Sequence, residues 1–230
     1  TWAVVLIGAA MIVYTVRGGA SAVIWTDVVQ LFVYVAGAAF VFFALLALIP
    51  CGWPEVVRVG TAAGKFRVFD LSATFARPYT LWAGILGGMA LTLSTHGTDQ
   101  FLVQRLLAAR SARDAARGLI LSGFLVLWQF GLFLMIGVML YAFYQHHPLT
   151  APLSRNDAIL PTFVIDHLQG GPAGFIMAAV VAAALSPSLN AMAATTVNDF
   201  YLIYVRPDAD ERRVMWLSRA ATIVWGVVQI

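Results

Sequence analysis

The chain has 230 residues, of which 61% are hydrophobic and only 11% are charged. Soluble domains average roughly 45–50% apolar and about 25% charged residues, so this composition excludes a water-soluble globule and indicates an integral membrane protein. The formal net charge is only +3, and the basic residues are scattered over short loops. This distribution argues against a nucleic-acid partner, and the lipid bilayer is the expected surroundings.

Six apolar segments approach or exceed the length that crosses about 30 Å of hydrocarbon. In chain order they cover residues 1–16, 22–49, 80–104, 118–144, 172–204 and 214–230. The chain opens on Thr1 rather than Met and stops at Ile230 within an apolar run, so we expect a single transmembrane domain, 1–230, truncated at both ends. The segments predict an all-α, polytopic membrane helix bundle.

Basic residues set the expected orientation of these segments. Alternating crossings place eight arginines on one side, mainly in short loops, where an excess of basic residues marks the cytoplasmic face. They are Arg17, Arg105, Arg110, Arg113, Arg117, Arg206, Arg212 and Arg213. Loops 105–117 and 205–213 are therefore predicted to be cytoplasmic. The longer loops 50–79 and 145–171 are predicted to be external, with a short amphipathic helix over 156–169.

Asp27 lies at the start of the second apolar segment. One interpretation is an interfacial carboxylate at a helix N-terminus, where the helix dipole favours negative charge by roughly 0.3–1 kcal/mol. The other is a carboxylate that lines a cytoplasmic exit path for a cation. The residues around Asp27 leave both interpretations open.

Asp99, Gln100 and Gln104 lie near the inner end of the third segment. A charge facing lipid would cost about 2.5–3.5 kcal/mol at mid-helix, so these side chains are expected to face protein or water. Gln100 and Gln104 are four residues apart and share one helical face. A hydrogen-bond network that ties this helix to its neighbours is favoured over a functional role.

His96 has three interpretations: a metal ligand, a proton carrier or a substrate contact. The other histidines, His146, His147 and His167, fall in a predicted external loop, so converging metal ligands are not expected. The membrane segments contain no nucleophile–base pair, so we expect no enzyme. A pore-facing histidine that forms a hydrogen bond is favoured.

Small and hydroxyl residues surround Pro187 in the middle of the fifth segment. Close packing of helices through small residues is one explanation. The other is that backbone carbonyls near Pro187, together with the hydroxyls of Ser186 and Ser188, coordinate a hard cation such as Na⁺, as interrupted helices do in secondary transporters.

Three blocks taken together resemble the sodium/solute symporter family, the relatives of the sodium-coupled sugar and proline transporters. They are YTVRGG at 14–19 with AVIWTDVVQ at 22–30, TDQ at 98–100 with VQR at 103–105, and SPSLN at 186–190 with NDFY at 198–201. The resemblance implies a leucine-transporter-like fold of two inverted five-helix repeats. This chain would hold about core helices 4 to 9, and the missing helices of the full-length chain would be its partners.

The resemblance also implies where sodium and solute bind. The family's sodium site would draw on Ala183 and Ser186, but its second serine position is Pro187 here, which makes Ser188 the candidate replacement. Substrate contacts would come from Thr92 and from the gate position Thr95, with His96 beside them.

Two further groups of residues match the family pattern. Asp27 corresponds to the family's carboxylate on the intracellular sodium path. The family also has a signature that is mainly structural, and this chain matches it with Asp99, Gln100, Gln104 and Arg105. The sugar-transporting branch has an aromatic residue at the position of Thr95 and a lysine at the position of Val126, so the sequence does not support a sugar as the solute.

The function implied by the resemblance is sodium-coupled symport of a small organic solute by alternating access, in a multi-pass protein of the cytoplasmic membrane. Na⁺ would be the coupling ion. Three alternatives stay open: a transporter-like sensory input domain of a signalling protein, a proton-coupled symporter, and a membrane enzyme that uses His96 and Asp99.

Overall fold

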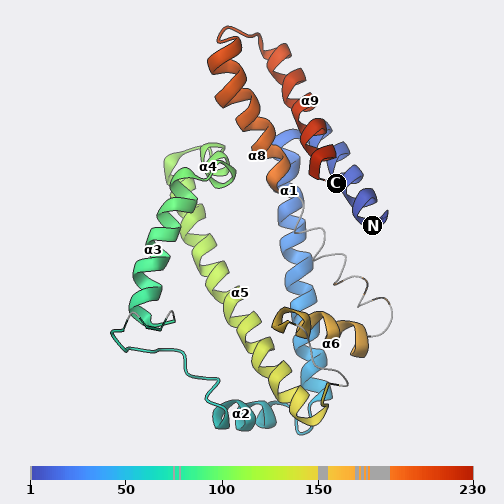
Figure 1. Ribbon diagram of the computed structural model, residues 1–230, viewed down its shortest axis with the longest axis vertical. Coiled ribbons are helices and arrows are strands. Elements are labelled where there is room, and N and C mark those ends of the chain that lie inside the picture. Colours follow the sequence, from blue (N-terminus) through green and yellow to red (C-terminus); the bar gives the residue numbers. More distant parts are fainter. Residues whose placement is uncertain are drawn as a thin grey trace. The chain divides into compact units, whose positions relative to one another are not determined.

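A computed structural model describes residues 2–74, 76–77, 79–149, 155–168, 171, 174, 176 and 187–229. The regular elements within these residues are all helices, with no strand among them (Figure 1). They form two compact units: residues 1–33, 99–108 and 178–230 make up the first, and residues 34–98 and 109–177 make up the second. The all-α architecture expected from the sequence is confirmed.

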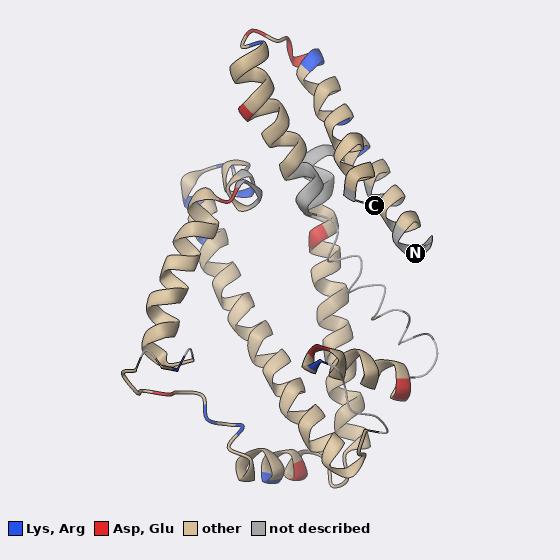
Figure 2. Cartoon of the chain, viewed as in Figure 1, with Lys and Arg blue, Asp and Glu red and all other residues tan. Residues whose placement is uncertain are grey.

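Two of the described helical stretches are long and apolar enough to cross a membrane. One is Ile24–Leu48, within helix α1 (Trp2–Leu48), and the other is helix α5 (Ala112–His146). They overlap the predicted segments 22–49 and 118–144, although α5 begins at Ala112, within the predicted loop 105–117. Helix α3 (Leu81–Thr98) carries no Asp, Glu, Lys or Arg, and its ribbon is tan in Figure 2, the colour of residues other than these four.

Helix α1 is longer than expected. The sequence predicted a loop at Arg17 and the two glycines after it, whereas the structure continues the helix through them to Leu48. A glycine inside a helix costs only about 1 kcal/mol relative to alanine, so the long apolar flanks can carry the helix across this point. The ribbon of α1 nevertheless changes direction in its N-terminal half (Figure 1).

The predicted segment 80–104 is interrupted at Asp99. Helix α3 ends at Thr98 and helix α4 (Gln100–Leu107) follows. The carbonyl of Asp99 accepts hydrogen bonds from the backbone N–H groups of Leu102 and Val103, at 3.1 and 2.9 Å. Aspartate is a preferred residue at the N-cap, the position that directly precedes a helix, so Asp99 lies at the start of α4 rather than inside a longer helix.

The first unit joins the N-terminal part of α1 and α4 to three helices from the end of the chain. These are α8 (Pro187–Thr195), the π-helix η2 (Thr196–Val205) and α9 (Glu211–Gln229). Helix α8 packs against α4 and α9. The indole Nε1 of Trp225 donates to Thr196 Oγ1 at 2.9 Å. A Cβ at Gly226 would lie 2.4 Å from Ile12 Cγ1, so α1 and α9 approach each other closely here.

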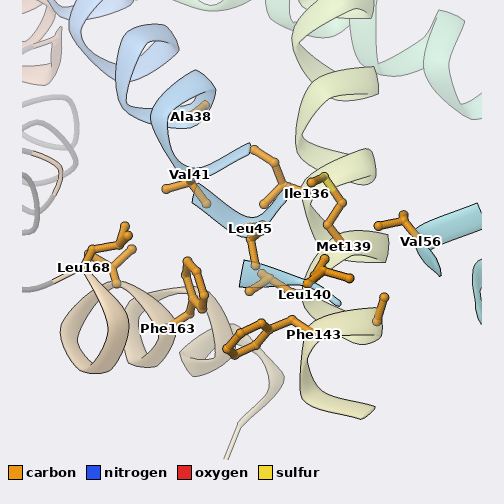
Figure 3. Packing of buried hydrophobic residues seen from close by; sticks show 13 residues of the cluster. Ala38, Val41, Leu45, Val56, Ile136, Met139, Leu140, Phe143, Phe163 and Leu168 are labelled. Carbon is orange, nitrogen blue, oxygen red and sulfur yellow. The ribbon is translucent and has the colours of Figure 1, made fainter. Parts of the chain in front are cut away.

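The second unit holds an apolar core at one end, shown in Figure 3. It is built by the C-terminal part of α1, by α2 (Trp53–Ala62), by the end of α5 and by α6 (Ile159–His167). Leu45, Met139 and Phe163 are fully buried there, and burial of such side chains stabilises by about 1.5–3 kcal/mol each. The predicted short helix over 156–169 is confirmed as the 3₁₀ turn η1 (Asn156–Ala158) followed by α6.

The helices of the second unit begin at recognisable signals. Ser111 precedes α5, and its Oγ accepts a hydrogen bond from the backbone N–H of Asp114 at 3.1 Å, which satisfies one of the free donors of the first turn. Helix α2 follows Gly52, whose φ of +58° favours glycine, and has Pro54 in its first turn. These positions predict a helix start, although the sequence analysis assigned the whole region to a loop.

Candidate functional site

Three of the predicted solute contacts lie together near the C-terminal end of α3. Thr92, Thr95 and His96 are spaced i, i+3 and i+4 and therefore share one face of the helix. Thr95 Oγ1 lies 3.1 Å from His96 Nδ1, and His96 Nδ1 lies 3.3 Å from the carbonyl oxygen of Thr92. The structure therefore brings these three residues into one hydrogen-bonded group.

The chemistry of this group suits a polar ligand. The Thr95 hydroxyl donates to the carbonyl of Leu91 at 2.9 Å, which leaves its oxygen able to accept. Thr92 is exposed, whereas Thr95 and His96 are half-buried. A threonine hydroxyl both donates and accepts, and an imidazole offers a donor and an acceptor that depend on its tautomer. One helix face thus presents donors and acceptors side by side.

Asp27 and Arg105 form an ion pair within the first unit. Arg105 Nη2 donates to Asp27 Oδ2, and the two side chains are 32% and 19% exposed, respectively. The sequence predicts separate roles for these residues, Asp27 on a cation path and Arg105 in a structural signature. The pair joins α1 to α4, so Asp27 is held by a partner that neutralises its charge.

Several predicted site residues lie outside what the structure describes. Ala183 and Ser186 are not among the described residues, and Ser188 is described only as part of the backbone of α8. The side chains of Gln100 and Gln104 are likewise outside the description. The sodium site and the glutamine network therefore stay predictions.

The histidines at the other end of the second unit pack against aromatic rings. His147 stacks on Phe143 with ring centroids 4.6 Å apart, and His167 stacks on Phe163 at 5.3 Å. Among the described residues, His, Cys, Asp and Glu nowhere gather in a group of three that could hold a metal ion. These two histidines therefore contribute to packing.

Glu55 is a charged centre that the sequence analysis did not single out. Arg58 donates to both of its carboxylate oxygens, at 2.6 and 2.7 Å, and His146 Nε2 lies 2.7 Å from Oε1. The Arg58 guanidinium, followed by His146, holds the pKa of Glu55 at about 2, below its usual 4.5. A Glu followed three residues later by Arg predicts such a pair on a helix. The contact of Glu55 with His146 links α2 to α5.

Comparison with known proteins shows what the chain as a whole resembles. The profile of the sodium:solute symporter family matches residues 1–230. The human sodium/iodide cotransporter is 30% identical over 229 residues, which cover 93% of this chain and 34% of the relative. The human sodium-coupled monocarboxylate transporter 1 is 31% identical over 236 residues, which cover 99% of this chain and 38% of the relative.

A solved structure has the same fold. It is the substrate-bound outward-open state of a Na⁺-coupled sialic acid symporter, and it superimposes with a TM-score of 0.83 at 28% sequence identity. The match covers 97% of this chain and 48% of that chain. The chain thus spans between about a third and a half of the length of these proteins, and the expected fold of a polytopic membrane helix bundle is confirmed.

Proposed function

The chain belongs to the sodium:solute symporter family, and from this premise we propose that the complete protein couples the entry of Na⁺ to the uptake of a small organic solute. The observation that carries the proposal is the match of the family profile over all 230 residues, supported by a Na⁺-coupled relative of the same fold. Symporters of this kind expose a site near mid-membrane to one side and then to the other. The protein would be a transporter and not an enzyme.

The solute would contact Thr92, Thr95 and His96 on α3. This assignment is supported by their shared helix face and by the 3.1 Å approach of Thr95 Oγ1 to His96 Nδ1. Thr95→Val removes the hydroxyl with little change of shape and should raise the KM for the solute about tenfold, the cost of one lost hydrogen bond. Ser94→Ala, on the opposite face of α3, is the matched control and should leave KM unchanged.

Sodium would bind at Ala183, Ser186 and Ser188, because oxygen ligands suit a hard cation. The substitution that tests this assignment most directly is Ser188→Ala, since Ser188 is the candidate replacement for the family's second serine. It should raise the sodium concentration needed for half-maximal uptake while leaving uptake at saturating sodium largely intact. An unchanged sodium dependence would remove Ser188 from the site.

Asp27 would line the cytoplasmic exit path for sodium. Its ion pair with Arg105 joins α1 to α4, so a sodium ion that uses this carboxylate must compete with the arginine. Asp27 would thus act as a carboxylate that alternates between Arg105 and the departing cation. Asp27→Asn should slow sodium release and reduce the maximal rate of uptake.

The protein would lie in the cytoplasmic membrane as a multi-pass protein, with loops 105–117 and 205–213 inside. The membrane potential then adds to the sodium gradient. One Na⁺ moving through ~100 mV contributes about 2.3 kcal/mol, and a tenfold gradient about 1.4 kcal/mol more. The sum supports accumulation of the solute on the order of several hundredfold, which is enough for nutrient uptake.

Uptake by the complete protein in proteoliposomes tests the proposal. The relatives are named for iodide and monocarboxylates and the solved symporter for sialic acid, so the screen starts with these solutes and adds neutral sugars. Uptake that rises with an inward sodium gradient supports sodium coupling. Uptake driven by a proton gradient alone would instead indicate a proton symporter, and solute binding without uptake would indicate a sensor.

A further inference from the structure

A cavity of about 330 Å³ lies within the first unit, between the N-terminal part of α1, the α8 and η2 helices, and α9. Ligand pockets in proteins start at about this size. The part of α1 that borders it runs beside α9 (Figure 1), in agreement with the close approach of Gly226 to Ile12. Thr92, Thr95 and His96, proposed above for the solute, do not line the cavity, and Ala183 and Ser186 lie outside the described residues.

The lining is positively charged. It includes Arg17 and Arg219, and none of its described residues is a carboxylate. Neither arginine forms an ion pair with a carboxylate in the part of the chain that the structure describes. Two guanidinium groups at one cavity suit an anion, and their planar arrays of N–H donors match the oxygens of a phosphate in particular.

A buried hydroxyl supports a ligand at this place. Thr15 lines the cavity and is only 3% exposed, yet its Oγ1 has no hydrogen-bond partner among the described residues. Buried polar groups are nearly always paired, so an unpaired one requires an explanation such as a bound ligand. Thr222, which also lines the cavity and is 5% exposed, donates to the carbonyl of Ser218 at 2.8 Å and is already paired.

Helix spacing explains why the cavity has both a polar and an apolar part. Met215, Ser218, Arg219 and Thr222 are spaced i, i+3, i+4 and i+7 and share one face of α9. Met215 supplies apolar surface beside the charged and hydroxyl groups. Such a mixed surface can receive a phosphate together with an attached glycerol or carbon chain.

We propose that this cavity binds a phosphate group, carried by an anionic lipid headgroup or by a free phosphorylated molecule. Arg17 and Arg219 pair with the phosphate oxygens and Thr15 supplies a further hydrogen bond. The distribution of arginines in the sequence predicts that Arg17 lies near the cytoplasmic face, and basic pockets between helices on that side are where anionic headgroups bind. This proposal does not depend on the proposed transport path.

Binding to the complete protein, purified in detergent, tests the proposal and separates the two sources. The probes are inorganic phosphate, dihexanoyl phosphatidylglycerol and dihexanoyl phosphatidylcholine, each titrated while the melting temperature is followed. Stabilisation by phosphatidylglycerol but not by phosphatidylcholine or phosphate supports a lipid headgroup. Stabilisation by inorganic phosphate supports a free phosphate. If neither anionic probe stabilises the protein, or if phosphatidylcholine acts as strongly as phosphatidylglycerol, the proposal is overturned.

Variants locate the binding. Arg17→Gln combined with Arg219→Gln should weaken binding of the effective probe at least about tenfold, since each charged hydrogen bond lost is worth that much. Arg213→Gln removes an exposed arginine of the same helix that does not line the cavity, and it should leave binding unchanged. Equal losses in both variants would indicate general attraction of anions and overturn the proposal.

Thr15→Val provides a second test that does not remove charge. Because Thr15 Oγ1 has no partner within the described chain, its replacement by a methyl group should not lower the melting temperature without a probe. It should nevertheless weaken binding severalfold. This variant also decides the question if the double arginine variant does not fold, and unchanged binding in Thr15→Val would contradict the assigned contact.

Discussion

A double-mutant cycle can measure the coupling energy of the ion pair between Asp27 and Arg105. Pairs on the surface contribute about 0.2–1 kcal/mol, whereas removal of one partner from a buried pair costs about 3–5 kcal/mol. The side chains of Asp27 and Arg105 are 19% and 32% exposed, which places them between these limits. A hydrogen bond to a charged group is worth about 1.5–3 kcal/mol, and we expect a coupling energy in this range.

The cycle consists of Asp27→Asn, Arg105→Gln and the double variant, with the free energy of unfolding measured in mixed micelles. If the pair contributes as reasoned, the double variant loses less stability than the sum of the two single variants. Arg105 makes a further interaction besides this pair, so Arg105→Gln should cost more than Asp27→Asn. Strictly additive losses would refute the reasoning.

A second pair in the same chain serves as a matched control. Arg117 and Asp114 are 3.9 Å apart on α5, and their side chains are 73% and 52% exposed. Exposed helical pairs spaced i, i+3 stabilise by about 0.2–0.5 kcal/mol. The cycle of Asp114→Asn and Arg117→Gln should therefore give a coupling several times smaller than that of Asp27 and Arg105.

Three further predictions concern charge and packing. The folded-state pKa of Glu55 is about 2, below its usual 4.5, so its ionised form stabilises the protein above pH 4.5, and this contribution disappears as the pH falls toward 2. Glu55→Gln should thus lower the melting temperature at neutral pH, and the melting temperatures of this variant and the wild type should converge near pH 2. A difference in melting temperature that does not change with pH would contradict this reasoning. Phe143→Ala should lower the free energy of unfolding by about 3–5 kcal/mol, because the Phe143 side chain is only 1% exposed. Phe69 is 65% exposed, so Phe69→Ala should leave the free energy of unfolding nearly unchanged. Gly226→Ala should cost about 1–3 kcal/mol by overpacking against Ile12, and the same change should cost little when tested in an Ile12→Ala background, where the obstructing atoms are gone.

The apolar segments were the most predictable part of the fold. A helix is needed wherever a chain crosses lipid, because backbone groups have no other partners there, and this requirement alone predicts the helical stretches at 24–48 and 112–146. The break at Asp99 was not predicted. The Asp99 carbonyl accepts from two amides of the following helix, and the hydropathy of the segment does not reveal where one helix ends and the next begins.

The candidate site was predictable to the extent that it is local. Thr92, Thr95 and His96 form one group because helical spacing alone places them on one face. Asp27 and Arg105, by contrast, are 78 positions apart, and only the three-dimensional structure shows that they pair. The contact of Glu55 with His146 likewise depends on how α2 lies against α5, whereas the pairing of Glu55 with Arg58 follows from their spacing.

Helix α3 carries the proposed solute contacts and yet buries none of its own side chains within the described chain. Substitutions on its polar face therefore remove no buried contact of this helix within the described chain. If α3 contacts the solute as proposed, such substitutions can change the solute without loss of these contacts, and relatives about 30% identical to this chain are named for solutes as different as iodide and monocarboxylates.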